Sequence, residues 1–179
     1  MRICSLQTNE QEKERRKELK SPVYNVKPIA FERIIGTAYT SNEMTDSNLD
    51  LLYKSIKEDG YTTPIVCYYD KVLDVYCIID GHYRYKVMRD HPDIYERENG
   101  MLPVTVIDKP EEGLIASNYR HNIARGIPNV YFTSKLIKRL ILLGKSEEYI
   151  KKHLNLSEAL LRRFKDLENF SDLLSEDET

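Results

Sequence analysis

The hydrophobic and polar positions of the chain change their period several times over its first 126 residues. Residues 21–35, "SPVYNVKPIAFERII", alternate between apolar and polar around two prolines, which predicts an extended strand. In residues 47–60, "SNLDLLYKSIKEDG", apolar side chains recur every three or four positions, so this segment predicts an amphipathic helix. Ser47 is expected to cap the start of the helix and Gly60 to supply the left-handed turn at its end.

A hairpin and a second helix are predicted next. Residues 63–80 hold two β-rich runs, "TPIVCYY" and "VLDVYCIID", which a turn at Asp70 and Lys71 separates. The helix that follows Gly81, "HYRYKVMRDHP", has to end near Pro92, because a proline ring cannot continue it.

The rest of the chain predicts one more strand and then only helices. Residues 102–108, "LPVTVID", read as a strand, and residues 109–126 read as a helix with a proline in its first turn and a glycine at its end. Residues 131–170 are helical throughout, with breaks at Gly144 and near Asn155. The order β-α-β-β-α-β-α followed by helices predicts an α+β or α/β domain and then an all-α module.

Composition places the chain among cytoplasmic globular proteins. Its 179 residues are 41% apolar and 31% charged, enough for one core and a small appended module. No apolar run has the length that a bilayer requires, and the N-terminal segment lacks the apolar core of a signal peptide, so no membrane partner and no secretion are expected. The three cysteines are odd in number and lack CxxC spacing, which argues against disulfides and against a thiolate zinc site.

The net charge of −2 conceals a strong local asymmetry. Residues 134–165 carry nine lysines and arginines against three glutamates, whereas residues 166–179 carry six acids and no base. Residues 9–20 mix five bases with four acids and hold almost no apolar side chains, so this segment cannot pack a core. The basic stretch is therefore the part of the chain with a candidate surface for phosphates.

The stretch "DGHYR", residues 80–84, joins a predicted buried strand to a predicted helix. A helix N-terminus offers unbonded backbone N–H groups and partial positive charge, which suits an anionic ligand. Gly81 permits a sharp turn and a close approach of the backbone, and Arg84 lies on the first helical turn. The alternative is a tight strand-to-helix turn in which the polar residues only cap and solvate the helix.

The basic stretch also has the pattern of a helix-turn-helix. Ile150 and Leu154 lie four apart on the first helix, and Asn155 stands at the turn, where asparagine tolerates the left-handed conformation. Leu160 and Leu161 are expected to face inward from the second helix, which Ser157 is expected to cap.

Several cations of this module are expected to be exposed and are candidates for DNA phosphates: Lys151, Lys152, Arg162, Arg163 and Lys165. The second helix begins Glu158-Ala159-Leu160, which is poor in groups that read base edges. A helical cap on the preceding domain and a docking surface for a protein partner are the alternatives to DNA contact.

Two motifs within this order of elements resemble the ParB/sulfiredoxin domain, over about residues 25–126. The first is "DGHYR" after the central strand, and the second is "HNIAR", residues 121–125, in the helix about forty residues later. The first motif is GERR-like in ParB partition proteins, GCHR-like in sulfiredoxins and DGHHR-like in the free-serine kinases of this superfamily. Here it matches the kinase version, with Tyr83 in place of the second histidine. The resemblance implies an α+β fold with a mixed sheet and a nucleotide bound between the two motifs.

The resemblance also implies which residues contact the nucleotide, expected to be ATP, ADP or CTP with Mg²⁺. Gly81, Arg84 and Arg125 are expected to hold phosphates, and Asn122 is expected to bind the magnesium ion through its carbonyl oxygen. Surface salt bridges are the alternative role for the two arginines. A local backbone hydrogen bond is the alternative role for Asn122.

Asp80 and His82 are the candidates for a catalytic base in phosphoryl transfer. His82 stands at the position of the sulfiredoxin cysteine, so reduction of a sulfinic acid is not expected. His121, a candidate partner in the second motif, stands where ParB has an acid, so ParB-style hydrolysis is not implied. Helix capping is the alternative role for Asp80, and these groups together with Asn122 are also an alternative ligand set for a transition metal.

The C-terminal half resembles the IbrB-like branch of ParB-domain proteins, in which an "RG" after the second motif leads into a helix-turn-helix-like region. Members of that branch are described as regulators or co-activators and pair with a protein that resembles phosphoadenosine phosphosulfate (PAPS) reductases. The expected organisation is a charged segment over 1–22, a nucleotide-binding domain over 23–126, a helical module over 127–170 and an acidic tail over 171–179.

Three functions remain open on the sequence. The first is nucleotide binding with magnesium, either for phosphoryl transfer or as a nucleotide-gated device. The second is transcriptional or partition-type regulation on DNA, with the nucleotide as a switch. The third is an adaptor for a PAPS-reductase-like enzyme, with a degenerate nucleotide site.

Overall fold

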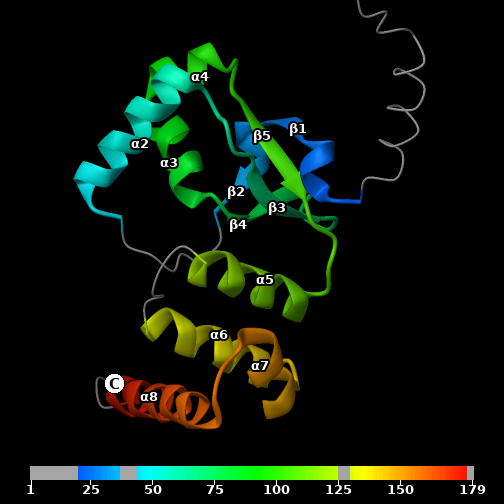
Figure 1. Cartoon of the computed structure of the whole chain (residues 1–179), viewed down its shortest axis with the longest axis vertical. Coiled ribbons are helices and arrows are strands. Elements are labelled where there is room, and N and C mark those ends of the chain that lie inside the picture. The colour runs from blue at the N-terminus through cyan, green and yellow to red at the C-terminus, as the bar shows by residue number, and fades with distance from the viewer. Residues whose placement is uncertain (1–19, 37–43, 125–129, 177–179) are drawn as a thin grey trace, which may run out of the picture.

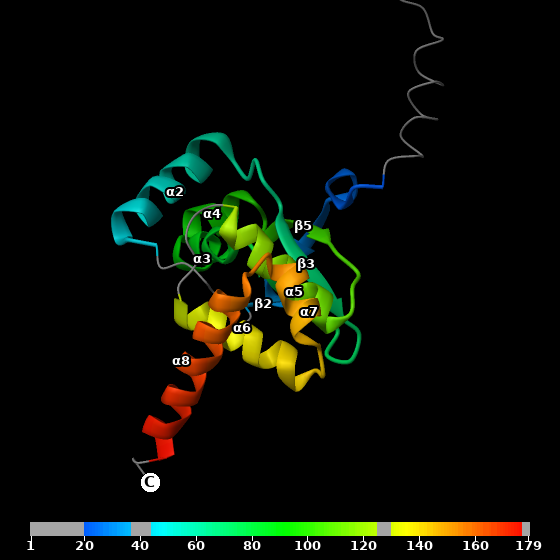
Figure 2. The same cartoon turned by 60° about the horizontal axis from the view of Figure 1, so that its bottom comes forward.

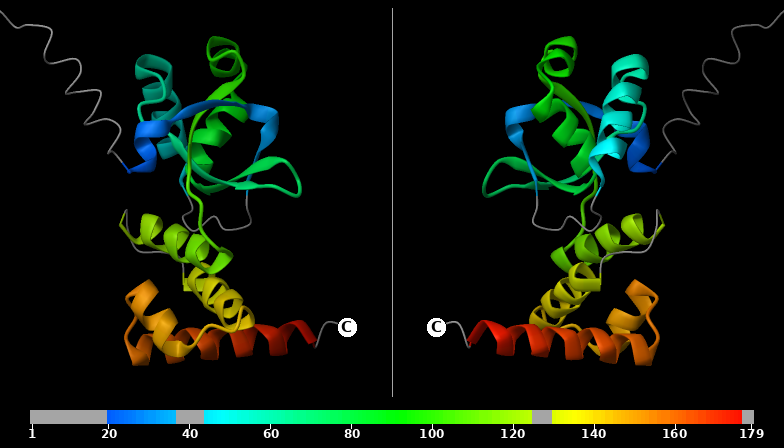
Figure 3. Two further views of the ribbon diagram at one scale, coloured as in Figure 1. Left: turned by 90° about the vertical axis from the view of Figure 1, so that its right-hand side faces the viewer. Right: turned by 90° about the vertical axis from the view of Figure 1, so that its left-hand side faces the viewer.

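The structure is a computed structural model that describes residues 20–36, 44–124 and 130–176, with side chains as far as residue 167. A five-stranded mixed sheet forms its centre, in the order β1-β5-β3-β4-β2. Helices α2, α3 and α4 lie on one side of the sheet, and α5 lies on the other, between the sheet and the remaining helices (Figures 1 and 3). The strands are β1 (Lys27–Ala30), β2 (Ile34–Ile35), β3 (Ile65–Asp70), β4 (Val75–Asp80) and β5 (Met101–Val106).

The sheet combines antiparallel and parallel pairs, so the α+β alternative is confirmed. Strands β1 and β5 pair antiparallel, as do β3 and β4, whereas β3 with β5 and β2 with β4 pair parallel. The central strands β5, β3 and β4 carry fully buried side chains, such as Ile65, Ile78 and Leu102. Within the described residues, no helix is long and apolar enough to cross a membrane.

The single strand predicted over residues 21–35 is wrong. The segment divides into a 3₁₀ turn at Pro22–Asn25, strand β1, a second 3₁₀ turn at Phe31–Arg33 and strand β2. The two strands lie on opposite edges of the sheet, β1 beside β5 and β2 beside β4. Phe31 holds the crossing point, because its ring stacks on Tyr85 at a centroid distance of 4.7 Å and its N–H donates to the Gly100 carbonyl at 2.8 Å.

Three helices cover one face of the sheet and bury its main core. They are α2 (Asp46–Asp59), α3 (His82–Asp90) and α4 (Pro92–Arg97). Ile56 of α2, Met88 of α3 and Ile94 of α4 are all buried against the strands. Helix α3 ends at Asp90, as the proline predicts, and helix α4, which was not predicted, begins at Pro92.

The cap of helix α2 differs from the prediction. The helix begins at Asp46, two residues before the predicted start, so Ser47 lies inside the first turn. Thr45 has the extended backbone of an N-cap, and its hydroxyl accepts a hydrogen bond from the Asn48 N–H at 3.4 Å. Gly60 follows the last turn with φ of 76°, in agreement with its predicted role.

We therefore expect Thr45→Ala to destabilise the protein by about 1 kcal/mol, because it removes the acceptor for an N–H at the start of the helix. Ser47→Ala, two positions away in the same turn, is the matched control and is expected to change the free energy of unfolding by less than about 0.5 kcal/mol. Urea denaturation followed by circular dichroism measures both. Equal losses in the two variants would show that Thr45 is not the cap.

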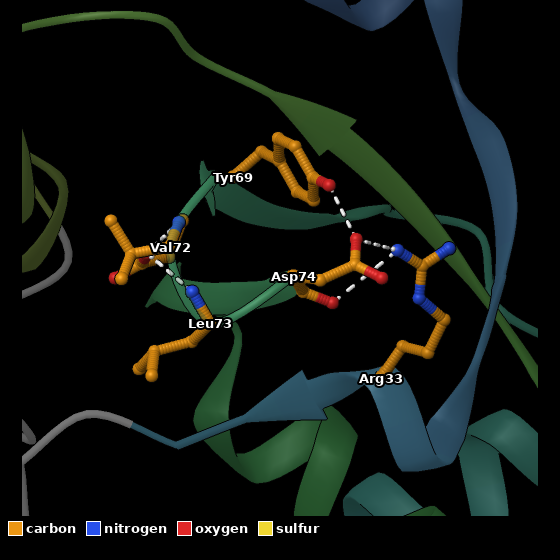
Figure 4. A network of polar contacts seen from close by, with 6 residues as sticks. Arg33, Tyr69, Val72, Leu73 and Asp74 are labelled. Atoms are coloured by element: carbon orange, nitrogen blue, oxygen red, sulfur yellow. Dashed lines mark hydrogen bonds and ion pairs between the residues drawn. The ribbon is translucent and has the colours of Figure 1, made fainter.

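The β3–β4 hairpin has a longer turn than predicted, because β4 begins only at Val75 (Figure 4). The Asp70 carboxylate accepts hydrogen bonds from the Val72 and Leu73 N–H groups, at 2.9 and 3.1 Å. Asp74 adopts a positive φ of 55° and bonds the Tyr69 hydroxyl and Arg33, which hold its pKa below the ordinary value. These contacts tie the hairpin tip to the 3₁₀ turn before β2.

A second hydrophobic core lies on the side of the sheet that α5 covers, and only helices contribute to it. It is built by α5 (Glu111–Ile123), α6 (Val130–Leu142), α7 (Glu147–Leu154) and α8 (Glu158–Glu176). Helix α5 belongs to both halves of the molecule: it packs against β4, and it contributes Ile115, Ala116 and Tyr119 to the helical core. The predicted domain boundary between 126 and 127 falls outside the described residues.

The predicted breaks in the helical region are confirmed. Gly144 adopts φ of 71° after α6, and Asn155 adopts the left-handed conformation between α7 and α8. Ser157 accepts a hydrogen bond from the Leu160 N–H, as a cap does. The inward position predicted for Leu160 is wrong, because its side chain is 42% exposed while its neighbour Leu161 is buried. Adjacent helical residues point about 100° apart, and at this position only Leu161 points toward the core.

The cysteines that the structure describes behave as buried apolar residues. Cys67 and Cys77 are both buried and both are free thiols. Burial raises the pKa of the Cys67 thiol to about 12, so this side chain is neutral at physiological pH. Cys4 lies outside the described residues.

Candidate functional site

The candidate site begins at the C-terminal end of strand β4. Asp80 is the last residue of the strand, and its side chain is only 6% exposed. Gly81 follows with φ of 103°, a conformation that residues with a Cβ rarely adopt, and it caps helix α3. The first turn closes through the Tyr85 N–H and the Gly81 carbonyl, at 3.0 Å. The "DGHYR" motif therefore forms a sharp strand-to-helix turn with a buried acid beside the helix N-terminus.

Arg84 folds back over this turn. One of its terminal nitrogens, Nη2, lies 3.5 Å from the Asp80 carboxylate and 3.3 Å from the Pro64 carbonyl. A Cβ on residue 81 would lie 2.8 Å from the same nitrogen, so the absence of a side chain at Gly81 makes room for the guanidinium. The Tyr61 hydroxyl donates to the Arg84 carbonyl at 3.0 Å and holds the backbone of this turn.

Helix α5 brings the second motif against the first. The imidazole Nδ1 of His121 lies 3.7 Å from the Asp80 carboxylate, the same oxygen that faces Arg84. Asn118, one turn earlier on α5, donates its amide N–H to the Ile79 carbonyl at 2.6 Å and so fixes the helix against the end of β4. A buried acid with a guanidinium on one side and a half-exposed imidazole on the other is thus assembled from segments about forty residues apart in the chain.

Asn122 continues the same face of α5. Its amide nitrogen donates to the Asn118 backbone carbonyl at 2.8 Å and to the Asn118 side-chain oxygen at 3.2 Å. This is the local hydrogen bond that was the alternative role for Asn122. The bond engages the amide nitrogen, whereas a magnesium ion would require the carbonyl oxygen.

A search of the known proteins places the chain in a family. It is 30% identical over 156 residues to the uncharacterized protein YbdM of Escherichia coli K12, and the match covers 87% of this chain and 74% of YbdM. The chain belongs to the YbdM family. No protein-family model matches the sequence.

The YbdM-family chain is also distantly similar to solved ParB structures. The chromosome-partitioning protein ParB of Caulobacter crescentus complexed with CTP-gamma-S aligns with a TM-score of 0.46 at 19% identity, over 86% of this chain and 87% of that one. The same ParB complexed to the centromeric parS site gives 0.48 at 15% identity, over 77% and 69%. With TM-scores below 0.5 and identities below 20%, the chain and ParB share only an approximate arrangement of helices and strands.

The remaining residues of the two motifs have other neighbours or lie outside the described residues. His82 is half-buried and lies beside Gly36, at the end of β2. The Tyr83 hydroxyl accepts a hydrogen bond from the Met44 N–H at 2.7 Å, which links α3 to the start of α2. Arg125 lies outside the described residues, so its place relative to Arg84 stays a prediction.

The part of this YbdM-family protein whose side chains are described does not support a transition-metal centre. Among residues 20–36, 44–124 and 130–167, no three histidine, cysteine, aspartate or glutamate side chains lie close enough to share a metal ion. Magnesium is less demanding, because it usually keeps several waters and takes only one or two protein oxygens besides phosphate oxygens. Asp80 and Asn122 carry oxygen donors of the kind that magnesium prefers, and their role as its ligands stays a prediction.

The cations of the helical module are partly neutralised by the module's own acids. Lys151 bonds Glu158 at 2.6 Å, and this contact raises the pKa of the lysine and lowers that of the glutamate. Lys165 bonds Glu147 at 2.5 Å. Lys152, Arg162 and Arg163 are exposed. The DNA-contacting role predicted for the five cations stays a prediction, with two of them paired to acids and three exposed.

Asn118 is a site residue that sequence reasoning missed. Its hydrogen bonds to Ile79 and Asn122 hold the two motifs together, although it belongs to neither of them. A signal was present in the sequence, since Asn118 and Asn122 lie four apart and so share one face of the helix. Tyr61, which bonds the Arg84 carbonyl, gave no comparable signal.

Proposed function

We propose that this protein binds a magnesium–nucleotide complex through its phosphates, at the junction of β4, α3 and α5. The observation that supports the proposal is the convergence of Arg84 and His121 on the buried Asp80 carboxylate, at 3.5 and 3.7 Å, beside the N-terminus of α3. Both groups carry or can carry positive charge, and the first-turn N–H groups of α3 add partial positive charge at the same place. Such a cluster suits the phosphates of a nucleotide.

Arg84 would exchange partners when a phosphate arrives. In the structure its guanidinium faces the Asp80 carboxylate at 3.5 Å and the Pro64 carbonyl at 3.3 Å, and neither contact is a short hydrogen bond. A phosphate can accept two parallel N–H bonds from an arginine, which is the stronger arrangement. The exchange would release the Asp80 carboxylate toward a magnesium ion, with Asn122 as the second protein oxygen.

Arg125 would supply a further phosphate contact from the second motif, and His82 or Asp80 would be the base if the bound nucleotide transfers a phosphoryl group. Phosphoryl transfer relies mostly on positioning and charge neutralisation, so this small set of groups is chemically sufficient. Our proposal places the chain in the IbrB-like branch of ParB-domain proteins. In that branch the nucleotide would act as a gate, and the partner would be DNA or a PAPS-reductase-like enzyme.

Calorimetric titration with ATP, ADP and CTP, with and without Mg²⁺, tests the proposal. CTP is included because the similar ParB structure holds a CTP analogue. We expect magnesium-dependent binding of at least one nucleotide, and a loss of about ten- to one-hundred-fold in affinity for Arg84→Ala, because a charge-assisted hydrogen bond contributes about 1.5–3 kcal/mol. Arg84→Lys keeps the charge but not the two-pronged geometry, so its nucleotide affinity is expected to lie between those of the wild type and Arg84→Ala.

Arg89→Ala is the matched control, because Arg89 lies on the same helix α3 and is exposed and paired with Asp90. Its affinity for nucleotide should equal that of the wild type. Circular dichroism is needed to show that each variant is folded. If folded wild type binds no nucleotide, or if the Arg84 and Arg89 variants bind equally well, the proposal fails.

A further inference from the structure

An apolar groove remains exposed on the outer side of the helical module. It lies between the first turn of α6 and helix α8 and has a volume of ≈ 600 Å³. Val130, Leu160 and Leu167 line it, and their side chains are 52%, 42% and 47% exposed. Phe164 also lines the groove and packs against the helical core. Apolar side chains gathered in this way mark a contact surface more often than chance exposure does.

The groove has the spacing of a helix-binding face. Leu160, Phe164 and Leu167 follow one another at i, i+4 and i+7 along α8, so they form a continuous stripe along one side of the helix. Helix α8 is 19 residues long and extends well past α6 and α7 (Figure 2). A second amphipathic helix laid along this stripe would cover it.

The two charged residues beside the stripe have opposite signs, so they can pair with the same residues of a second copy. Arg163 and Asp166 also line the groove, about one helical turn apart on the same edge of α8. Neither side chain forms an ion pair within the part of the chain that the structure describes, and both are exposed. If two α8 helices lie antiparallel about a two-fold axis near Phe164, Arg163 of one copy faces Asp166 of the other, and the reciprocal pair forms at the same time.

We propose that this groove is the interface of a homodimer, formed by antiparallel packing of α8 against α8 of a second copy. Closed two-fold contacts use the same patch on both subunits, which requires a patch that is complementary to itself. The groove meets this requirement. Its apolar residues would contact the same apolar residues of the second copy, and Arg163 of each copy would contact Asp166 of the other. Val130 of α6 in each copy would add to the apolar contact area. The interface does not depend on nucleotide binding, because the groove residues belong to α6 and α8 and not to the "DGHYR" or "HNIAR" motifs.

Sedimentation equilibrium of the full-length chain over a wide range of concentrations tests the interface. The wild type is expected to be a dimer. Arg163→Asp and Asp166→Arg each place like charges opposite one another, so each is expected to raise the dimer dissociation constant at least about tenfold. The double variant, with both charges exchanged, restores two attractive pairs and is expected to regain most of the lost affinity.

Arg162→Asp is the matched control, because it makes the same charge change at an exposed neighbour that does not line the groove. It is expected to leave the dissociation constant within about twofold of the wild type. Leu167→Asp places a charge in the apolar stripe and is expected to give a folded monomer, with unchanged circular dichroism. A wild type that is monomeric at every concentration overturns the proposal, and so does a double exchange that fails to recover dimerisation.

Discussion

Replacing Gly81 with alanine is expected to lower the free energy of unfolding by about 2–4 kcal/mol, a large effect for a single methyl group. Two causes combine at this position. The backbone φ of 103° is strained for any residue with a Cβ. The added methyl group would also lie 2.8 Å from Nη2 of Arg84, so the guanidinium has to shift from its position beside the buried Asp80 carboxylate. Urea denaturation measures the loss.

A double-mutant cycle separates the two causes. If displacement of the guanidinium contributes, Gly81→Ala is expected to cost less in an Arg84→Ala background, where only the backbone strain of about 1–2 kcal/mol remains. Gly144→Ala is the control for strain alone, because Gly144 has φ of 71° and open space around the position of its Cβ. Identical costs for Gly81→Ala in the two backgrounds would contradict the role given to Arg84.

Leu136→Ala is expected to lower the free energy of unfolding by about 2–5 kcal/mol. Leu136 of α6 is completely buried at the centre of the helical core, where it lies among residues of α5, α7 and α8. Truncation removes apolar contacts and leaves a cavity that the surrounding helices can fill only in part. Because α5 belongs to this core and carries His121, the same variant is expected to weaken nucleotide binding without touching the site. Urea denaturation and calorimetry measure the two effects.

Leu142→Ala is the matched control, since it makes the same chemical change near the end of the same helix, at a side chain that is 70% exposed. Its effect on stability is expected to stay within about 0.5 kcal/mol. A comparable loss in both variants would mean that burial in the helical core does not set the stability of α6.

The residues of the candidate site could be predicted from the sequence, but the contacts between them could not. Asp80, Gly81 and Arg84 follow one another in a short motif, and a glycine between a buried strand and a helix has a local backbone reason to be there. The sequence also pointed to Asn122 and His121, but their contacts depend on the packing of α5 against the end of β4. The hydrogen bond from Asn118 to Ile79 that fixes this packing joins residues far apart in the chain, and no local pattern encodes it.

What the sequence by itself determined is the order of the elements from the helix before Gly60 onward, apart from α4, and most of the places where they end. Periodicity, Pro92, Gly144 and Asn155 act through the backbone of adjacent residues, so their effects are visible without knowledge of the fold. Only the tertiary structure decided which segments become neighbours. In the folded protein β1 and β2 lie at opposite edges of the sheet, and Leu160 points away from the helical core. His121 lies beside Asp80. These outcomes depend on which surfaces bury the most apolar area together, a property of the whole chain and not of any stretch of it.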